Sequence, residues 1–156
     1  MLEIFVDADA CAVKEEIYRV AKRHGLTVTL VANAPMRHPA EPWVRLVVVE
    51  GRFDAADDWI TDHAQPDDLV ISGDIPLAAR CLEKGARVIG PTGKAFTRTG
   101  ISEALAAREI LGQMRDMGLM TKGPAPFGKK DRSRFLQALE ETIRRVRRDP
   151  RPAPPG

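Results

Sequence analysis

The chain has 156 residues, of which 44% are apolar and 29% charged, a balance typical of one globular domain and not of a disordered or fibrous chain. Its two cysteines, Cys11 and Cys81, form no CxxC pair, which excludes a disulfide framework and a cysteine-based zinc site. No apolar run approaches the roughly 18 residues of a membrane span, so we expect a cytoplasmic protein with no membrane partner.

Five short apolar runs predict buried strands. They cover residues 2–6, 27–32, 44–49, 68–72 and 87–90, are rich in Val, Ile and Leu, and are bounded by Gly, Pro, Asn or Asp. Segments with helical periodicity alternate with them, at residues 11–24, 54–64, 76–85, 101–117 and 132–148. This order predicts an α/β fold: a single three-layer α/β/α domain with a mainly parallel sheet of about five strands.

The last predicted helix carries five apolar side chains at helical spacing, so we expect it to pack on the domain: Phe135, Leu136, Leu139, Ile143 and Val146. Residues 149–156, with four prolines, are expected to form a disordered tail, which places the domain at residues 1–148. Residues 120–130, with two glycines and two prolines, are expected to form a loop.

Aspartates follow two of the predicted strands. Ligands of open parallel sheets bind outside the carboxyl ends of the strands, where Asp7 and Asp9 follow the first strand and Asp74 follows the fourth. Asp7 and Asp9 would point the same way if the extended backbone persists through Ala8. Aspartate before a helix also acts as an N-cap, and for Asp9 or Asp74 taken alone that is the better interpretation.

Asp57 is the fourth acidic candidate. In the predicted helix at residues 54–64 it lies at the edge of the apolar stripe, whereas Asp58 and Asp62 fall on the solvent side. A carboxylate at a core edge must be paired, protonated or bound to a cation, because burying a lone charge is costly. A salt bridge to a neighbouring basic residue is the alternative.

Oxygen-only acids suit a hard divalent cation. Mg²⁺ and Mn²⁺ prefer oxygen ligands and keep several waters, so Asp7, Asp57 and Asp74 are sufficient as a predicted metal site. One or two such ions activate water and neutralise charge that develops on a phosphate. The histidines show no metal-ligand spacing: His24, His38 and His63.

Charge is divided unequally along the chain. Residues 1–74 hold 14 acidic and 7 basic side chains, and residues 75–156 hold 8 acidic and 17 basic. Carboxylates gathered at one site and cations that hold a polyanion would give this division, and so would two solvated faces of unequal charge. The candidate phosphate contacts are Ser72, Lys94, Arg98, Lys129, Lys130, Arg132 and Arg134.

Four motifs in order resemble the YaiI/YqxD family of functionally uncharacterised bacterial proteins: residues 6–14, 53–58, 71–78 and 131–135. Ala12 departs from the family pattern, which usually has proline there. The resemblance implies a PIN-like fold, whose metal-dependent nucleases gather acids at strand ends. It points to Asp7, Asp57 and Asp74 as the acidic core with Asp9 beside them. It also implies further residues along the same edge: Lys14, Asn33, Lys94, Asp131 and Arg132.

Three functions are compatible with these residues. The first is a Mg²⁺- or Mn²⁺-dependent nuclease with a nucleic-acid substrate, RNA favoured over DNA. The second is a haloacid-dehalogenase-type phosphatase with Asp7 as nucleophile and Asp9 as acid, although Gly73-Asp74 comes too early for the later acidic motif of that class. The third is a non-catalytic nucleic-acid-binding module whose carboxylates serve only as caps.

Overall fold

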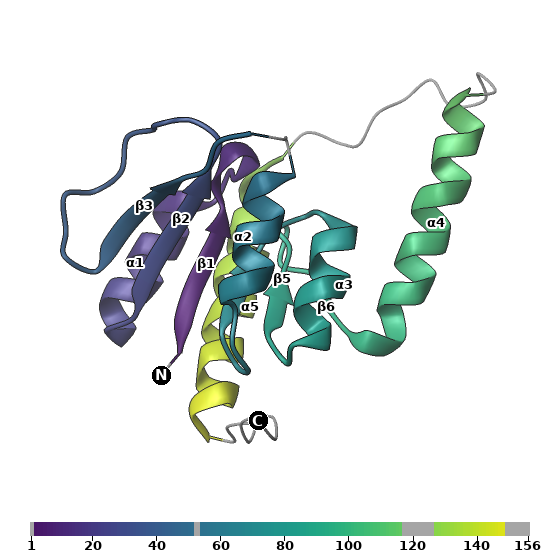
Figure 1. Cartoon of the computed structure of the whole chain (residues 1–156). Coiled ribbons are helices and arrows are strands. Elements are labelled where there is room, and N and C mark those ends of the chain that lie inside the picture. The colour runs from purple at the N-terminus through teal and green to yellow at the C-terminus, as the bar shows by residue number, and fades with distance from the viewer. Residues whose placement is uncertain (1, 52–53, 117–126, 149–156) are drawn as a thin grey trace.

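The computed structural model, shown in Figure 1, describes residues 2–51, 54–116 and 127–148. One six-stranded sheet has the order β3-β2-β1-β4-β5-β6. Its strands are β1 (Glu3–Asp7), β2 (Thr27–Ala32), β3 (Val44–Val48), β4 (Leu69–Ile71), β5 (Arg87–Ile89) and β6 (Ala95–Phe96). Strands β1 to β5 are parallel, and β6 is antiparallel to β5. The predicted α/β fold is confirmed.

Helices cover both faces of the sheet, as the alternation predicted (Figure 1). They are α1 (Lys14–His24), α2 (Ala55–His63), α3 (Ile75–Glu83), α4 (Arg98–Asp116) and α5 (Lys129–Arg148). Helices α1 and α5 pack on one face and α2 and α3 on the other, while α4 follows the edge strand β6 and packs against α3. The three layers therefore bring the starts of α1, α3 and α5 to the carboxyl ends of the strands.

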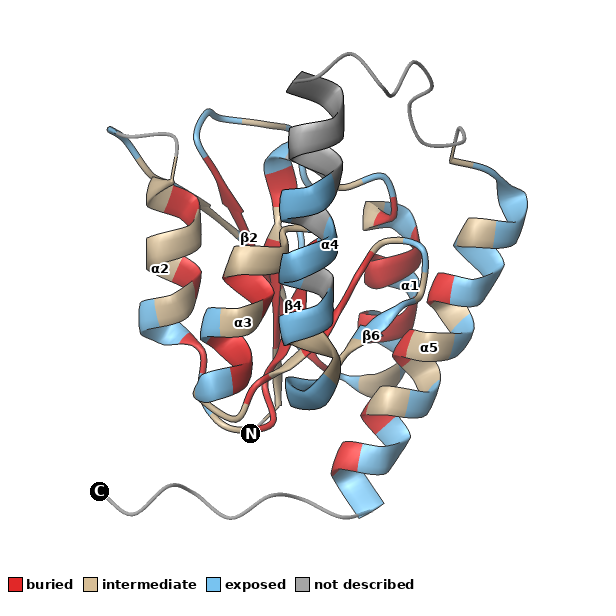
Figure 2. Ribbon diagram, turned by 90° about the vertical axis from the view of Figure 1, so that its right-hand side faces the viewer, coloured by how far each residue is buried: buried red, intermediate tan, exposed pale blue. Residues whose placement is uncertain are grey.

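Two cores form because side chains alternate along each strand. In β1, Ile4 and Val6 pack toward α1 and α5, whereas Phe5 packs toward α2 and α3. Four of the five apolar residues expected to anchor α5 are buried, and Leu136 is partly buried against the same core. Figure 2 shows this buried stripe on the side of α5 that faces the sheet. The expected packing of the C-terminal helix is confirmed.

The structure corrects several predicted boundaries. A short 3-10 helix at Ala8–Ala10 precedes α1, which begins at Lys14 and not at residue 11. Helix α5 begins at Lys129, so Lys129 and Lys130 belong to a helix and not to the expected loop. Strand β6 was not predicted, because two residues are too short to show a periodicity.

Some predictions concern residues outside the described part of the chain. The expected tail at residues 149–156 and most of the expected loop at residues 120–130 lie there. Within the residues that the structure describes, no helix combines the length and the apolar composition that crossing a membrane requires.

Candidate functional site

Three of the four candidate aspartates lie on elements that meet at the carboxyl ends of the strands. Asp7 is the last residue of β1, and Asp74 precedes α3 after β4, the neighbour of β1 in the sheet. Asp57 lies in the first turn of α2, which packs beside both α3 and β1. Strand pairing and helix packing therefore place three carboxylates from separate parts of the sequence in one region.

The Ser72 hydroxyl links two of these aspartates. Its Oγ donates to Asp7 Oδ2 at 3.0 Å and accepts from the backbone N–H of Asp74 at 3.0 Å. Ser72 is buried, so the structure gives its hydroxyl an organising role between the two acids. The single hydrogen of this hydroxyl is donated to Asp7, so in this arrangement Ser72 has none to donate to a phosphate oxygen.

Asp74 also caps a helix. Its Oδ1 accepts from the backbone N–H of Leu77 at 2.9 Å, at the start of α3. This confirms the capping interpretation of Asp74, and it fixes the orientation of the carboxylate at the strand ends. Capping and cation binding use different oxygens of one carboxyl group, so the two roles are compatible.

Burial and neighbouring negative charge raise two carboxyl pKa values in this cluster. Burial, the largest cause, and the charges of Asp74 and Asp7 together raise the pKa of Asp57 to about 6, against an opposing contribution from Arg80. Burial likewise raises the pKa of Asp7, the hydrogen bond from Ser72 lowers it, and the charges of Asp74 and Asp9 raise it. Removing the protons from this cluster at neutral pH therefore costs free energy that a nearby cation would offset.

The donor chemistry fits a hydrated divalent cation. Among the described residues, no three His, Cys, Asp or Glu side chains lie close enough together to ligate one ion directly. Mg²⁺ keeps several of its waters and often uses only one or two carboxylates directly, so a hydrated ion would not need three direct carboxylate ligands. Asp7, Asp57 and Asp74 are the residues that would hold such an ion.

Asp9 is directed differently from Asp7. Its Oδ2 accepts from the backbone N–H of Asn33 at 3.0 Å and from Asn33 Nδ2 at 2.9 Å. The extended backbone on which a shared direction depended ends at Ala8, where the 3-10 helix begins. The expectation that Asp7 and Asp9 point the same way is thus wrong: Asp7 accepts a hydrogen bond from Ser72, which follows β4, and Asp9 accepts hydrogen bonds from Asn33, which follows β2.

Residues from the start of α1 and α5 border the same edge. Lys14 Nζ donates to the carbonyl of Cys11 at 3.3 Å. Arg132 Nη1 donates to the carbonyl of Ala12 at 2.8 Å and lies 3.2 Å from Glu16 Oε1. Asp131 Oδ2 accepts from the backbone N–H of Gly128 at 3.0 Å, in the first turn of α5. These hydrogen bonds fix the positions of the first residues of α1 and α5 and are made by Lys14, Asp131 and Arg132.

A further cation, Lys94, lies on the turn between β5 and β6, and Arg134 of α5 lines the same cavity. Lys94, Asp131 and Arg134 line one shallow cavity of about 560 Å³. The turn can approach α5 because Gly93 has no side chain: a Cβ there would lie 2.7 Å from the backbone carbonyl of Arg134. Lys129 and Lys130, at the start of α5, are exposed and free to meet a ligand in solution.

Arg98 lies away from the aspartates. Its guanidinium donates to the carbonyls of Leu82 and Glu83 at the end of α3, at 3.1 and 3.2 Å. Since α3 begins at the carboxyl ends of the strands, its last residues lie toward their amino ends. Arg98 is thus not brought together with the other candidate phosphate contacts.

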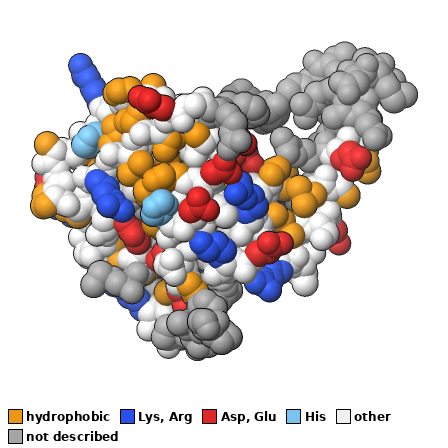
Figure 3. All heavy atoms as spheres, viewed as in Figure 1, with side chains coloured by type: hydrophobic (Ala, Val, Ile, Leu, Met, Phe, Trp, Pro, Cys, Tyr) orange, Lys and Arg blue, Asp and Glu red, His pale blue; other side chains and the backbone are white. Residues whose placement is uncertain are grey.

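The face formed by α2 and α3 does not carry charge of a single sign. Figure 3 shows acidic and basic side chains intermixed over the face formed by α2 and α3. On this face, Arg80 Nη1 lies 2.9 Å from Asp58 Oδ1. Opposite charges are thus paired on the part of the surface that this view shows.

Comparison with known proteins settles the family. Residues 5–145 match the family model described as "Uncharacterized BCR, YaiI/YqxD family". The chain belongs to the YaiI/YqxD family. A UPF0178 protein of Rhodospirillum centenum is 55% identical over 152 residues, 95% of this chain and 99% of that protein. One of Brucella suis is 54% identical over 146 residues, 93% and 91% of the two chains. No solved structure gave a significant match.

Sequence reasoning missed two residues around the site of this YaiI/YqxD member. The positive charge of Arg80 on α3 lowers the pKa of Asp57 and so opposes the effect of burial. Glu16 on α1 accepts a hydrogen bond from Arg132. Glu16 is buried although it is charged, which the apolar stripe of α1 did not indicate. Neither contact leaves a signal in local spacing, because each joins elements far apart in the sequence.

Proposed function

We propose that this protein is a Mg²⁺- or Mn²⁺-dependent nuclease that hydrolyses phosphodiester bonds in nucleic acid, RNA in preference to DNA, in the cytoplasm. The observation that carries the proposal is the grouping of Asp7, Asp57 and Asp74 at the carboxyl ends of a parallel sheet, where burial and the charge of Asp74 raise the pKa values of Asp7 and Asp57. A divalent cation would offset the free energy that ionising Asp7 and Asp57 costs.

The residues around this cluster have separate roles in such a reaction. Asp7 is held by Ser72, and Asp74 is held by its cap, so both carboxylates are oriented before a ligand arrives. A bound cation would supply positive charge against the phosphate and make water more acidic. Lys94 and Arg134 line the neighbouring cavity, from which they would contact backbone phosphates.

The phosphatase alternative is disfavoured by the contacts of Asp9. In that mechanism Asp9 would protonate the leaving group beside Asp7, but its carboxylate is occupied by two N–H groups of Asn33. Asp9 would have to break both hydrogen bonds to serve as an acid, which costs free energy. The nuclease mechanism does not require these hydrogen bonds to break.

The direct test is hydrolysis of a fluorescent single-stranded oligonucleotide by the full chain with Mg²⁺ or Mn²⁺. Asp7→Asn keeps the acceptor for Ser72 but removes a negative charge, so we expect activity to fall by about 100-fold or more. Asp62→Asn is the matched control, because Asp62 is exposed on α2 and faces away from the cluster. It should retain wild-type activity.

Three outcomes would contradict the proposal. One is cleavage that survives removal of divalent cations with a chelator. Another is an equal loss in Asp7→Asn and Asp62→Asn. The third is accumulation of an aspartyl-phosphate on Asp7 with a small phosphate ester, which would assign the phosphatase chemistry instead.

A further inference from the structure

A second cavity lies toward the opposite ends of the strands. It has a volume of about 570 Å³, and Gly85 and Ala86, which lead into β5, contribute to its lining. Apolar atoms of Leu82, Val88 and Phe96 form part of its wall. This volume and this mixture of apolar wall with a few polar groups are typical of sites for small ligands.

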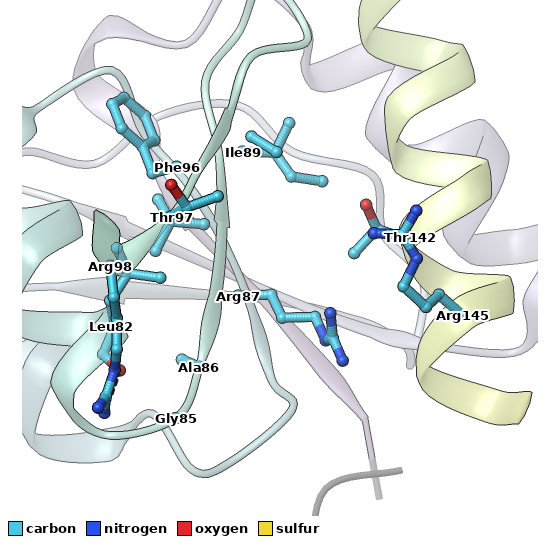
Figure 4. A pocket seen from close by; sticks show the side chains of 12 residues that line it. Leu82, Gly85, Ala86, Arg87, Ile89, Phe96, Thr97, Arg98, Thr142 and Arg145 are labelled. Atoms are coloured by element: carbon cyan, nitrogen blue, oxygen red, sulfur yellow. Dashed lines mark hydrogen bonds between the residues drawn. The ribbon is translucent and has the colours of Figure 1, made fainter. Parts of the chain in front are cut away.

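Three arginines from three different elements border the cavity: Arg87 on β5, Arg98 on α4 and Arg145 on α5. Figure 4 shows Arg87 and Arg145 extending into the space between β5 and α5, with Thr142 beside Arg145. Arg98 lies on the other side, next to Leu82. The guanidinium groups thus surround the cavity and are not gathered on one helix face.

Two of these arginines are held in place. Arg87 Nε lies 3.3 Å from Asp67 Oδ1, and Arg98 donates to the carbonyls at the end of α3. Arg145 is exposed at the rim. Among the described residues, only one carboxylate, that of Asp67, forms an ion pair with any of these three guanidinium groups. The cavity therefore retains an excess of positive charge. Guanidinium groups match phosphate oxygens in geometry and in charge.

We propose that this cavity binds a small phosphate ester with an aromatic or apolar group, the chemistry of a nucleoside monophosphate. The phosphate lies between Arg87 and Arg145, and the hydroxyl of Thr142 is available to it. The ring reaches past the edge of β5 toward Leu82 and Phe96, which line the same cavity on the α3 side of the sheet. This site is separate from the aspartates and does not rest on the nuclease function.

The test is calorimetric titration of the full chain with adenosine monophosphate, inorganic phosphate and adenosine. Adenosine monophosphate should bind at least about tenfold more tightly than either fragment, because it alone uses both the arginines and the apolar wall. Arg145→Gln should weaken that binding about tenfold or more. Arg144→Gln is the matched control: it removes the same charge from the same helix, outside the cavity lining, and should leave the affinity unchanged.

Amide chemical shifts locate the ligand. We expect shifts at Thr97 and Thr142, which line the cavity, and unchanged affinity in Asp7→Asn. The proposal is overturned if adenosine monophosphate does not bind, if inorganic phosphate binds as tightly, or if Arg144→Gln weakens binding as much as Arg145→Gln. Loss of binding in Asp7→Asn also overturns it, because the ligand would then occupy the aspartate cluster.

Discussion

The two ends of the sheet carry opposite charge chemistry. At the carboxyl ends, burial and the negative charge of Asp74 raise the pKa values of Asp7 and Asp57. Toward the amino end of β5, Arg87 and Arg145 enter one cavity. Between these regions, Arg80 and Asp58 form an ion pair on the surface. For each end of the sheet we propose a ligand of the opposite charge: a cation at the aspartates and a phosphate ester at the arginines.

The largest expected effect separates metal binding from capping at Asp74. Asp74→Asn keeps a good N-cap but removes the charge, so hydrolysis should fall about 100-fold while stability is nearly unchanged. Asp74→Ala should lose the same activity and also about 1 kcal/mol of stability. Oligonucleotide cleavage and chemical unfolding measure the two effects. Full activity in Asp74→Asn would show that Asp74 acts only as a helix cap and takes no part in hydrolysis.

A smaller effect concerns the start of α5. Lys129→Ala with Lys130→Ala should weaken oligonucleotide binding about tenfold and flatten the slope of log affinity against log salt by about 1.4, at about 0.7 per phosphate contact on a single strand. Mn²⁺ binding should be unchanged. Fluorescence anisotropy at several salt concentrations measures the slope.

The control for that experiment lies at the other end of the same helix. Arg144→Ala with Arg148→Ala removes the same charge from exposed positions and should leave the slope unaltered. If both double variants change the slope equally, nucleic acid binds the basic residues along the whole of α5. Binding would then not be specific to the end of α5 that lies beside the aspartates.

The smallest effect is the pH dependence of Asp57. Its pKa is about 6 in the folded chain against an ordinary 3.8, so the folded state holds the proton more tightly than the unfolded state. The stability from this proton is complete below about pH 4 and is lost as pH rises through about 6. Without divalent cation, wild type should therefore lose a few degrees of Tm relative to Asp57→Asn between about pH 4.5 and 7.

Thermal unfolding of both proteins at the two pH values tests this, and added Mg²⁺ at neutral pH should restore the loss in wild type alone. A Tm difference that stays constant with pH would show that Asp57 is ionised freely in the folded chain.

Local patterns predicted much of this fold. The apolar runs marked five parallel strands, and the spacing of Phe135, Leu139 and Ile143 marked the buried face of α5. These features depend on neighbours within a few residues. The strand β6 depends instead on the turn that contains Gly93 and on its contact with α5, so no local pattern indicates it.

The residues of the candidate site also differ in whether a local sequence pattern predicts their position. Asp7 and Asp74 could be placed from strand ends, and Asp57 from a helical wheel, because each position follows from one element. The direction of Asp9 toward Asn33 and the bridge from Ser72 to Asp7 join separate strands. The cavity lined by Arg87, Arg98 and Arg145 is formed by residues of α3, β5, α4 and α5. Because these elements are far apart in the sequence, no local pattern could indicate that the residues lie together.

The most direct test of the account is a crystal structure of the full chain soaked with Mn²⁺, with anomalous diffraction used to locate the ion. The proposed metal site predicts an anomalous peak among Asp7, Asp57 and Asp74 in wild type, and loss of that peak in Asp7→Asn with the fold unchanged. Absence of a peak at this cluster in wild type, or a peak that persists in Asp7→Asn, would contradict it.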